Sequence, residues 1–391
     1  MSVSTRLYRY ARPSIAAAYS RLFDSHVLTR AQLLDNPPEG YSVYQFGTNE
    51  SYNFDRPRHT GEFPTVIERQ VGERTVPSSF VVEATDATVI GPSALVDASG
   101  YLLLESALGE YERLIDASVR ALLSGQLPFE TRFQHTNVTG YDDPIFLLTG
   151  PWSTEYYHWI TDYLIQVFAI EAYRERVGRD PLVLVPSNPP AWIRDSLSFA
   201  GIDDNRILEW AGGRTTFSSV AVGGSHYHTI SARESHAPSP TMIAQLGDRI
   251  RAAVPEVKAD VADQAKRLYV SRADATDRRV RNENALMKVL DDYGFERIVP
   301  GKKSFAEQVQ LFSEAEIVLG PHGAGLTNIV FATETVLIEL FGSYRNACFF
   351  VLAKEINHDY ACVTCRPEGA DLIINPNDVD AVLDAIISSD V

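Results

Sequence analysis

A loop at residues 320–328 has the residue types and spacing of an anion-binding turn. It reads Gly320-Pro321-His322-Gly323-Ala324-Gly325-Leu326-Thr327-Asn328 and lies between a predicted strand and a predicted helix. Glycines let a ligand approach the backbone, and free amides at a helix start favour phosphate or diphosphate. We therefore expect the amides of residues 323–326, with His322 and Asn328, to bind an anion. The alternative is a tight turn whose glycines serve only a positive φ.

Arginines follow the first predicted strand of the same region. Arg272 ends that strand, and Arg279 and Asn282 come shortly after it. Ligands of open α/β sheets bind at the carboxyl ends of the strands, so this segment is predicted to face the glycine loop. Guanidinium groups suit a diphosphate, which favours Arg272 and Arg279 as its ligands, with Asn282 beside them. The alternative is that residues 278–281 form a solvated basic turn.

A third cluster could act as an acid or base. His158 and Asp162 are four residues apart in a predicted helix, so they share one face of it. A histidine paired with a carboxylate at a cleft can remove a proton from a hydroxyl, which makes both residues catalytic candidates. The competing interpretation is a histidine that only packs in the core or caps the helix.

Two further features bear on ligands and metals. Glu339 lies inside an apolar strand, so it needs a partner, which a nucleotide ribose or a structural salt bridge would supply. Cys362 and Cys365, with Cys348 upstream, fall short of a four-ligand zinc set. Asp378 and Asp380 lie in the first turn of a predicted terminal helix, where acidic residues are expected anyway. We therefore expect no metal and no cofactor.

The elements that must position these residues fall into two series. Residues 1–140 look irregular and β-rich, with strands predicted at 79–83, 87–91 and 100–105. Strands and helices then alternate in both halves, which predicts parallel βαβ units. The first series comprises strand 144–149, helix 155–176, strand 181–186, helix 191–200 and strand 205–210. The second comprises helix 240–253, strand 267–272, helix 282–293, strand 296–300, helix 304–313, strand 315–320 and strand 335–341.

These series predict an α/β protein of two doubly wound, Rossmann-like domains facing a cleft, with a small β-rich N-terminal elaboration. The acceptor-side domain is expected at 1–230, of which 144–222 is the Rossmann-like part. The nucleotide-binding domain is expected at 231–391, with a last helix near 377–389. A segment rich in Gly, His, Ser and Pro at 223–240 is the predicted hinge.

Composition excludes some classes of partner. The 391 residues carry a net charge of −16, which disfavours nucleic acid. Three cysteines fit a reducing compartment, and no apolar run reaches the ~20 residues that span a bilayer. Residues 6–23 are expected to pack as a helix on their own domain; a peripheral contact with a membrane surface is the alternative. We therefore expect a cytoplasmic protein, with the inner face of the cell membrane as the alternative location.

Taken together, the motifs resemble those of glycosyltransferase family 61. The resemblance rests on His158-Trp159-x-x-Asp162, Ser271-Arg272, Arg279-x-x-Asn282-Glu283, the loop 320–328 and Glu339-Leu340, and it covers about residues 145–345. This family includes capsular and plant-wall sugar transferases and animal O-linked N-acetylglucosaminyltransferases.

The resemblance implies a GT-B-like fold, a nucleotide-sugar donor in the C-terminal domain, inversion at the anomeric carbon and no obligatory metal. It implies that Arg272, Arg279 and the amides of residues 323–325 meet the donor diphosphate, that Glu339 takes the ribose, and that His158 or Asp162 faces the acceptor. The expected acceptor is a glycan or glycolipid hydroxyl, in polysaccharide or glycoprotein glycan assembly. The alternatives are a nucleotide-sugar epimerase, a polysaccharide pyruvyl transferase, or a non-catalytic sugar-binding protein.

Overall fold

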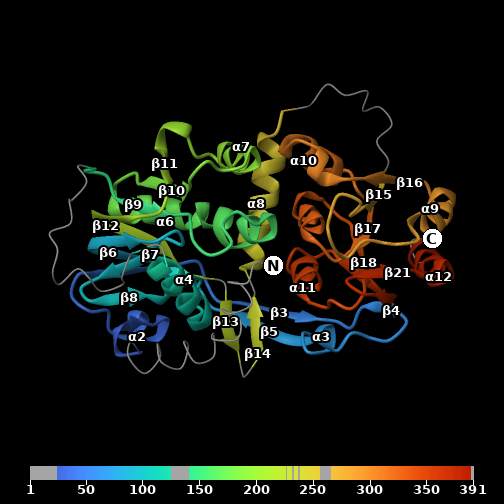
Figure 1. Ribbon diagram of the computed structural model, residues 1–391, viewed down its shortest axis with the longest axis horizontal. Helices are drawn as coiled ribbons and strands as arrows, with labels where there is room; N and C mark the ends of the chain where they lie inside the picture. The colour runs from blue at the N-terminus through green and yellow to red at the C-terminus, as the bar shows by residue number, and fades with distance from the viewer. Residues whose placement is uncertain are drawn as a thin grey trace.

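The computed structural model describes residues 24–123, 125, 141–225, 227–230, 233–236, 238–255 and 266–388. The predicted helix at residues 6–23 lies outside this part of the chain. The described residues form a mixed α/β protein with two large sheets, one in each half of the molecule (Figure 1). Among them, no helix combines the length and the apolar character that crossing a bilayer requires.

The first sheet combines the predicted meander with the predicted βαβ units. Its strands are β1 (Val27–Leu28), β2 (Tyr41–Phe46), β6 (Ser79–Ile90), β7 (Leu95–Ala98), β8 (Tyr101–Leu103), β9 (Ile145–Leu147), β10 (Leu182–Pro186), β11 (Ile207–Trp210) and β12 (Arg214–Gly223). The order is β1-β8-β7-β6-β12-β9-β10-β11, and β2 also pairs with β6. Strand β12, which the sequence analysis missed, lies parallel to β9 and antiparallel to β6. The β-rich residues therefore extend the same sheet and do not form a separate unit.

Helices cover this sheet. They are α2 (Arg30–Asp35), α4 (Tyr111–Leu123), α6 (Val167–Val177) and α7 (Ala191–Phe199), with short 3-10 helices η1 (Asp24–His26), η2 (Leu104–Ala107) and η6 (Asp204–Arg206). Strands β9, β10 and β11 run parallel because α6 and α7 carry the chain back between them. This part agrees with the predicted alternation.

The second sheet is parallel and has the order β16-β15-β17-β18-β19-β4. Its strands are β15 (Arg267–Val270), β16 (Phe295–Ile298), β17 (Ile317–Pro321), β18 (Val336–Phe341), β19 (Asp359–Thr364) and β4 (Arg58–Thr60). The helices of this half are α9 (Glu283–Asp292), η8 (Pro300–Lys302), α10 (Phe305–Ser313), η9 (Ala324–Phe331), α11 (Cys348–Glu355) and α12 (Pro376–Ile387), and β20 (Arg366–Glu368) pairs with β21 (Asp371–Ile373). The predicted α/β alternation of this half is therefore present, and parallel sheets of this kind are compatible with a Rossmann-like fold.

One early segment crosses from the first half to the second. Strand β4 pairs in parallel with β19, so residues 58–60 extend the C-terminal sheet although they precede the boundary predicted at residue 231. The segment includes α3 (Thr65–Glu68), between the antiparallel strands β3 (Glu50–Phe54) and β5 (Gly72–Val76). In Figure 1 this blue segment runs beneath the C-terminal half. We call residues 54–72 the crossing segment.

The region between the halves contains ordered elements. Strands β13 (Tyr227–Ile230) and β14 (Arg233–His236) form a hairpin within the segment predicted as a hinge. Helix α8 (Pro240–Ala253) begins at Ser239, whose hydroxyl accepts from the amide of Met242 at 3.1 Å. One hydrophobic core includes residues of both halves, such as Trp159 and Phe312, together with Leu246 of α8. The two halves therefore share buried surface.

Candidate functional site

A large cavity opens where the two halves and the crossing segment meet. Its volume is about 1130 Å³, slightly above the usual range for sites that bind small molecules. The described side chains that line it are Val66, Arg69, Gln70, Glu110, Arg113, Trp152, Glu155, Tyr156, Tyr157, His158, Arg278, His322, Gly323, Ala324, Tyr344, Arg345, Asn346, Ala347, Cys348, Phe349 and Val351. Arginines outnumber acidic residues on these walls, in a chain of strongly negative charge. The cavity is therefore suited to an anionic ligand.

The first wall carries His158 on an irregular helix. The sequence predicts one helix at 155–176, but the structure divides it into α5 (Tyr156–His158), a π-helical turn (Trp159–Tyr163), a 3-10 turn (Leu164–Gln166) and α6. In the π-helical turn the amide of Leu164 donates to the carbonyl of Trp159, five residues back. Such turns are rare and are frequent at functional sites.

The π-helical turn buries Asp162 beneath His158. Nδ1 of His158 lies 2.8 Å from Oδ2 of Asp162, and the two side chains are 23% and 2% exposed. A buried carboxylate that accepts from Nδ1–H sets the tautomer and leaves Nε2 as the reactive nitrogen. His158 lines the cavity and Asp162 does not. The geometry therefore distinguishes the two candidates for the base: His158 lies at the cavity, and Asp162 lies behind it.

The second wall carries His322 at the end of β17. Nδ1 of His322 lies 2.5 Å from Oε1 of Glu339 on the neighbouring strand β18, and Glu339 is fully buried. The hydroxyl of Tyr360 on β19 donates to Oε2 of the same carboxylate at 2.5 Å. Burial and the negative charge of Glu339 hold the pKa of Tyr360 well above its usual value, so the phenol keeps its proton.

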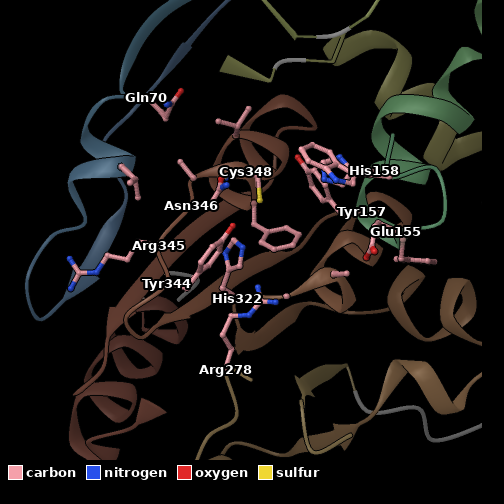
Figure 2. A pocket seen from close by; sticks show the side chains of 18 of the residues that line it. Gln70, Glu155, Tyr157, His158, Arg278, His322, Tyr344, Arg345, Asn346 and Cys348 are labelled. Atoms are coloured by element: carbon pink, nitrogen blue, oxygen red, sulfur yellow. The ribbon is translucent and has the colours of Figure 1, made fainter. Parts of the chain in front are cut away.

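This arrangement differs from the predicted contact between Glu339 and a ribose. Both oxygens of Glu339 already accept hydrogen bonds from protein side chains, and the residue does not line the cavity. Glu339 therefore orients His322, which does line the cavity, and reaches a ligand only through it. In Figure 2 His322 and Tyr344 face the opening from this wall, while Tyr157 and His158 face it from the other.

The glycine loop, which contains His322, leads into the predicted helix, and this helix is the 3-10 helix η9. The first hydrogen bond of this helix is donated by Leu326 to the carbonyl of Gly323 at 2.9 Å. The helix thus supplies no acceptor to the amides of Gly323, Ala324 and Gly325, and two of these residues, Gly323 and Ala324, line the cavity. Leu326 is fully buried and packs in the core.

Close packing, and not a positive φ, explains the glycine at 323. Its φ is 171°, an extended conformation that any residue adopts. A Cβ atom at this position would come within 2.1 Å of Nη1 of Arg272, so only glycine lets the guanidinium lie against the loop. Arg272 donates to the carboxylate of Asp277 at 3.0 Å, and burial, followed by the charge of Arg278, lowers its pKa. The predicted neighbourhood of Arg272 and the loop is therefore present, although Arg272 itself does not line the cavity.

Of the two neighbouring arginines, Arg278 lines the cavity, whereas Arg279, which was the predicted ligand, does not. Arg279 is held at Asp371 by a 2.9 Å ion pair, and this pairing raises its pKa. Arg278 has a left-handed backbone (φ 56°), and its guanidinium carbon lies 5.0 Å from the ring centre of Tyr344. The ion pair with Asp371 therefore holds Arg279 away from the cavity, while Arg278 lies beside Tyr344 on the cavity wall.

Two further residues that were predicted to bind the ligand form hydrogen bonds within the protein instead. Asn282 pairs with the backbone of Ile374, through its amide group at 2.8 Å and its oxygen at 3.0 Å. Asn328 is fully buried; its oxygen accepts from the hydroxyl of Tyr156 at 2.6 Å. Asn328 therefore ties the loop to the helix that carries His158, and neither asparagine lines the cavity.

The cysteines do not form a shared site. Cys362 lies in the core on one face of the second sheet, and Cys365 lies in the core on the other face. Burial raises the pKa of both thiols to about 12. Within the described ranges, no group of three or more His, Cys, Asp or Glu side chains has the arrangement that would hold a metal ion.

Sequence reasoning missed several residues of the cavity. Trp152, Tyr344 and Arg113 lie outside the predicted motifs, and Arg69 and Gln70 belong to the crossing segment. No motif in the sequence marks these residues, apart from the position of Trp152 next to Pro151. The pairing of β4 with β19 brings the crossing segment to the cavity, and this is a contact between residues about 300 positions apart.

Comparison with known proteins supports the resemblance inferred from the motifs. No curated protein matches the chain. Residues 156–338 match the family described as Glycosyltransferase 61, and the matched region runs from α5 through the glycine loop into β18. This match supports an assignment to glycosyltransferase family 61, and it indicates a glycosyltransferase.

Proposed function

We propose that this protein transfers a sugar from a nucleoside-diphosphate sugar to a hydroxyl of a glycan or lipid-linked glycan, with inversion and without an obligatory metal. The observation that carries the proposal is the pair of histidines, each bound to a buried carboxylate, on two walls of one cavity. One wall offers a base, and the other offers groups that bind an anion.

On the acceptor side, Nε2 of His158 removes the proton from the acceptor hydroxyl. Asp162 holds the imidazole through Nδ1 and stabilises the imidazolium that forms. The acceptor oxygen forms a bond to the anomeric carbon while the bond from that carbon to the diphosphate oxygen breaks. An attack from the side opposite the leaving group gives inversion.

On the donor side, the departing diphosphate gains negative charge as the bond breaks. Arg278 and the amides of Gly323 and Ala324 line the cavity, where they can meet that charge. His322, which Glu339 orients through Nδ1, meets the diphosphate from the cavity wall. Arg272, packed on Gly323, adds a further positive charge behind the loop. These groups neutralise the charge of the leaving diphosphate, as a divalent cation does in metal-dependent transferases. They therefore support a metal-independent reaction.

The proposal is tested with purified protein and a panel of nucleoside-diphosphate sugars, with and without oligosaccharide acceptors. We expect a glycoside product whose anomeric configuration, read by NMR, is opposite to that of the donor, and equal rates with and without EDTA. A product that retains the donor configuration would contradict inversion. Formation of a new nucleotide sugar without acceptor would favour an epimerase, and transfer from a pyruvyl donor would favour a pyruvyl transferase.

The Asp162→Asn variant serves as the control for contaminating enzymes. Donor binding without any product, across all acceptors, would favour the non-catalytic alternative. Thermal shift in the presence of each nucleotide sugar separates these cases, since a ligand that binds the folded state raises the melting temperature even without turnover.

A further inference from the structure

Trp152 is held at the cavity in a conformation that a bulky residue rarely adopts. Its φ is 64°, in the left-handed region. The turn around it is fixed by several hydrogen bonds: Glu155 donates its amide to the carbonyl of Trp152 at 2.8 Å, and the hydroxyl of Tyr163 donates to the carbonyl of Pro151 at 2.7 Å. Strained residues of this kind persist where the surrounding structure imposes them, and they are concentrated at functional sites.

The indole lies beside the proposed base. The ring centres of Trp152 and His158 are 4.6 Å apart with a tilt of 33°, and the guanidinium carbon of Arg113 lies 4.1 Å from the Trp152 ring centre. Arg113 in turn forms an ion pair with Glu110 at 2.7 Å, and both residues line the cavity. A ligand that reaches His158 therefore also meets an aromatic surface and a carboxylate–guanidinium pair.

Positioning of His158 does not account for the exposure of Trp152. The residue is 42% exposed, whereas Trp159 and Trp210 are buried. If the Trp152 ring served only as a spacer, its full burial would stabilise the folded protein, because apolar surface exposed to water costs free energy. Exposed apolar surface inside a cavity is typical of a binding site.

We propose that Trp152 is the platform for a sugar ring of the acceptor, with Glu110 and Arg113 exchanging hydrogen bonds with its hydroxyls. The inference rests on the proposed function and deepens it, because it names the side chains that bind the sugar ring whose hydroxyl reacts. The C–H groups on one face of a pyranose pack on the apolar surface of an indole, while its hydroxyls need polar partners.

A binding experiment tests the platform without requiring turnover. Cello-, manno-, chito- and galacto-oligosaccharides are titrated into the full chain, with UDP or GDP present, while tryptophan fluorescence is recorded. The chain has four tryptophans, of which Trp152 is the one with a large exposed area inside the cavity. We expect at least one oligosaccharide series to change the emission with saturation, and the change to disappear in Trp152→Phe.

Calorimetry on Trp152→Ala should show an oligosaccharide Kd about tenfold or more above that of the wild type, since a central aromatic anchor carries much of the binding energy. Tyr141→Ala is the matched control, because Tyr141 is exposed to a similar degree (40%) and does not line the cavity. Its Kd should equal that of the wild type. Melting curves of both variants identify any loss of folding, and Trp152→Phe then serves as the milder variant.

Kinetics separate a platform from a spacer. With a platform, Trp152→Ala raises the acceptor KM about tenfold or more, and Trp152→Phe restores part of it. A lower kcat at unchanged acceptor KM, or no oligosaccharide binding to the wild type, would overturn the proposal. So would equal transfer to a serine-containing peptide. If oligosaccharides bind at Trp152 but no nucleotide sugar is turned over, the proposed function fails while the platform stands.

Discussion

The two histidine–carboxylate pairs of the cavity are built from the same groups but in different settings. His158 and Asp162 lie one turn apart on a π-helical segment, and the imidazole is 23% exposed beside Trp152. His322 and Glu339 lie on adjacent parallel strands, and the imidazole is 7% exposed beside Tyr344. Glu339 also accepts from Tyr360, so its second oxygen is bound as well.

These two settings allow histidine to serve two different roles in one cavity. An imidazole that a hydroxyl can reach and that can relax after accepting a proton is suited to act as a base. An imidazole at the end of a strand, with a fully bound carboxylate behind it, is held in one orientation and is suited to contact an anion. We therefore assign proton removal to the helical pair and diphosphate binding to the strand pair.

The largest expected effect comes from the helical pair. His158→Ala should lower kcat by about 10²–10⁴-fold, because it removes the base. Asp162→Asn should cost a similar factor, because an amide that donates to Nδ1 selects the wrong tautomer. Steady-state rates with saturating donor measure both, and titration with the nucleoside diphosphate should give nearly wild-type affinity. If Asp162→Asn kept full activity, proton removal could no longer be assigned to the helical pair, and the two pairs would not differ in role.

For the strand pair, we expect activity to depend more on the negative charge of Glu339 than on the shape of its side chain. Glu339→Gln keeps the volume but removes the counter-ion of His322, so we expect kcat to fall about 10–100-fold and nucleoside diphosphate binding to weaken. Tyr360→Phe removes only the second hydrogen bond and should cost less in both measurements, although it leaves one buried oxygen unpaired. Equal losses in the two variants would indicate a structural role for the whole cluster.

Arg278 and Arg279 allow a further test of the wall that binds the donor. Arg278→Ala should lower kcat/KM for the donor about 10–100-fold, because it removes a positive charge from the cavity. Arg279→Ala breaks an ion pair with Asp371 that is 40% exposed on the arginine side. It should leave kcat/KM within about twofold and lower the melting temperature only slightly. The reverse order of effects would restore the assignment made from the sequence.

The smallest effect concerns a buried carboxylate that has no imidazole partner. Burial raises the pKa of Glu355 on α11 well above 4.5, while the hydroxyl of Tyr52, at 3.4 Å, and the charge of Arg74 oppose the shift. The carboxyl therefore keeps its proton in the folded state at pH values where the unfolded chain has lost it. The free energy of unfolding should then fall by up to about 1.4 kcal/mol per pH unit as the pH rises from about 4.5 towards the raised pKa.

Glu355→Gln removes this titration. Urea unfolding at pH 5.5 and pH 8 should show that the variant gains stability relative to the wild type as the pH rises. The same difference in stability at both pH values would show that Glu355 titrates like an exposed carboxylate.

Part of the site could be predicted from local sequence. The alternation of strands and helices in residues 267–341 is a local pattern, and it placed the glycine loop after β17. The spacing of His158 and Asp162 is also local, and the structure brings these two side chains together. The same reasoning could not distinguish Arg278 from Arg279, because the ion pair that holds Arg279 away from the cavity is with Asp371, 92 residues later in the chain.

Local sequence patterns were sufficient to predict the α/β alternation, the pairing of His158 with Asp162 and the position of the glycine loop, because hydrophobic periodicity and glycine spacing act over a few residues. Only the tertiary structure decided that Glu339 lies behind His322, that Asn328 binds Tyr156, and that the crossing segment completes the cavity. These contacts join residues that are far apart in the chain or on neighbouring strands. They depend on strand order and burial, which short-range patterns do not specify.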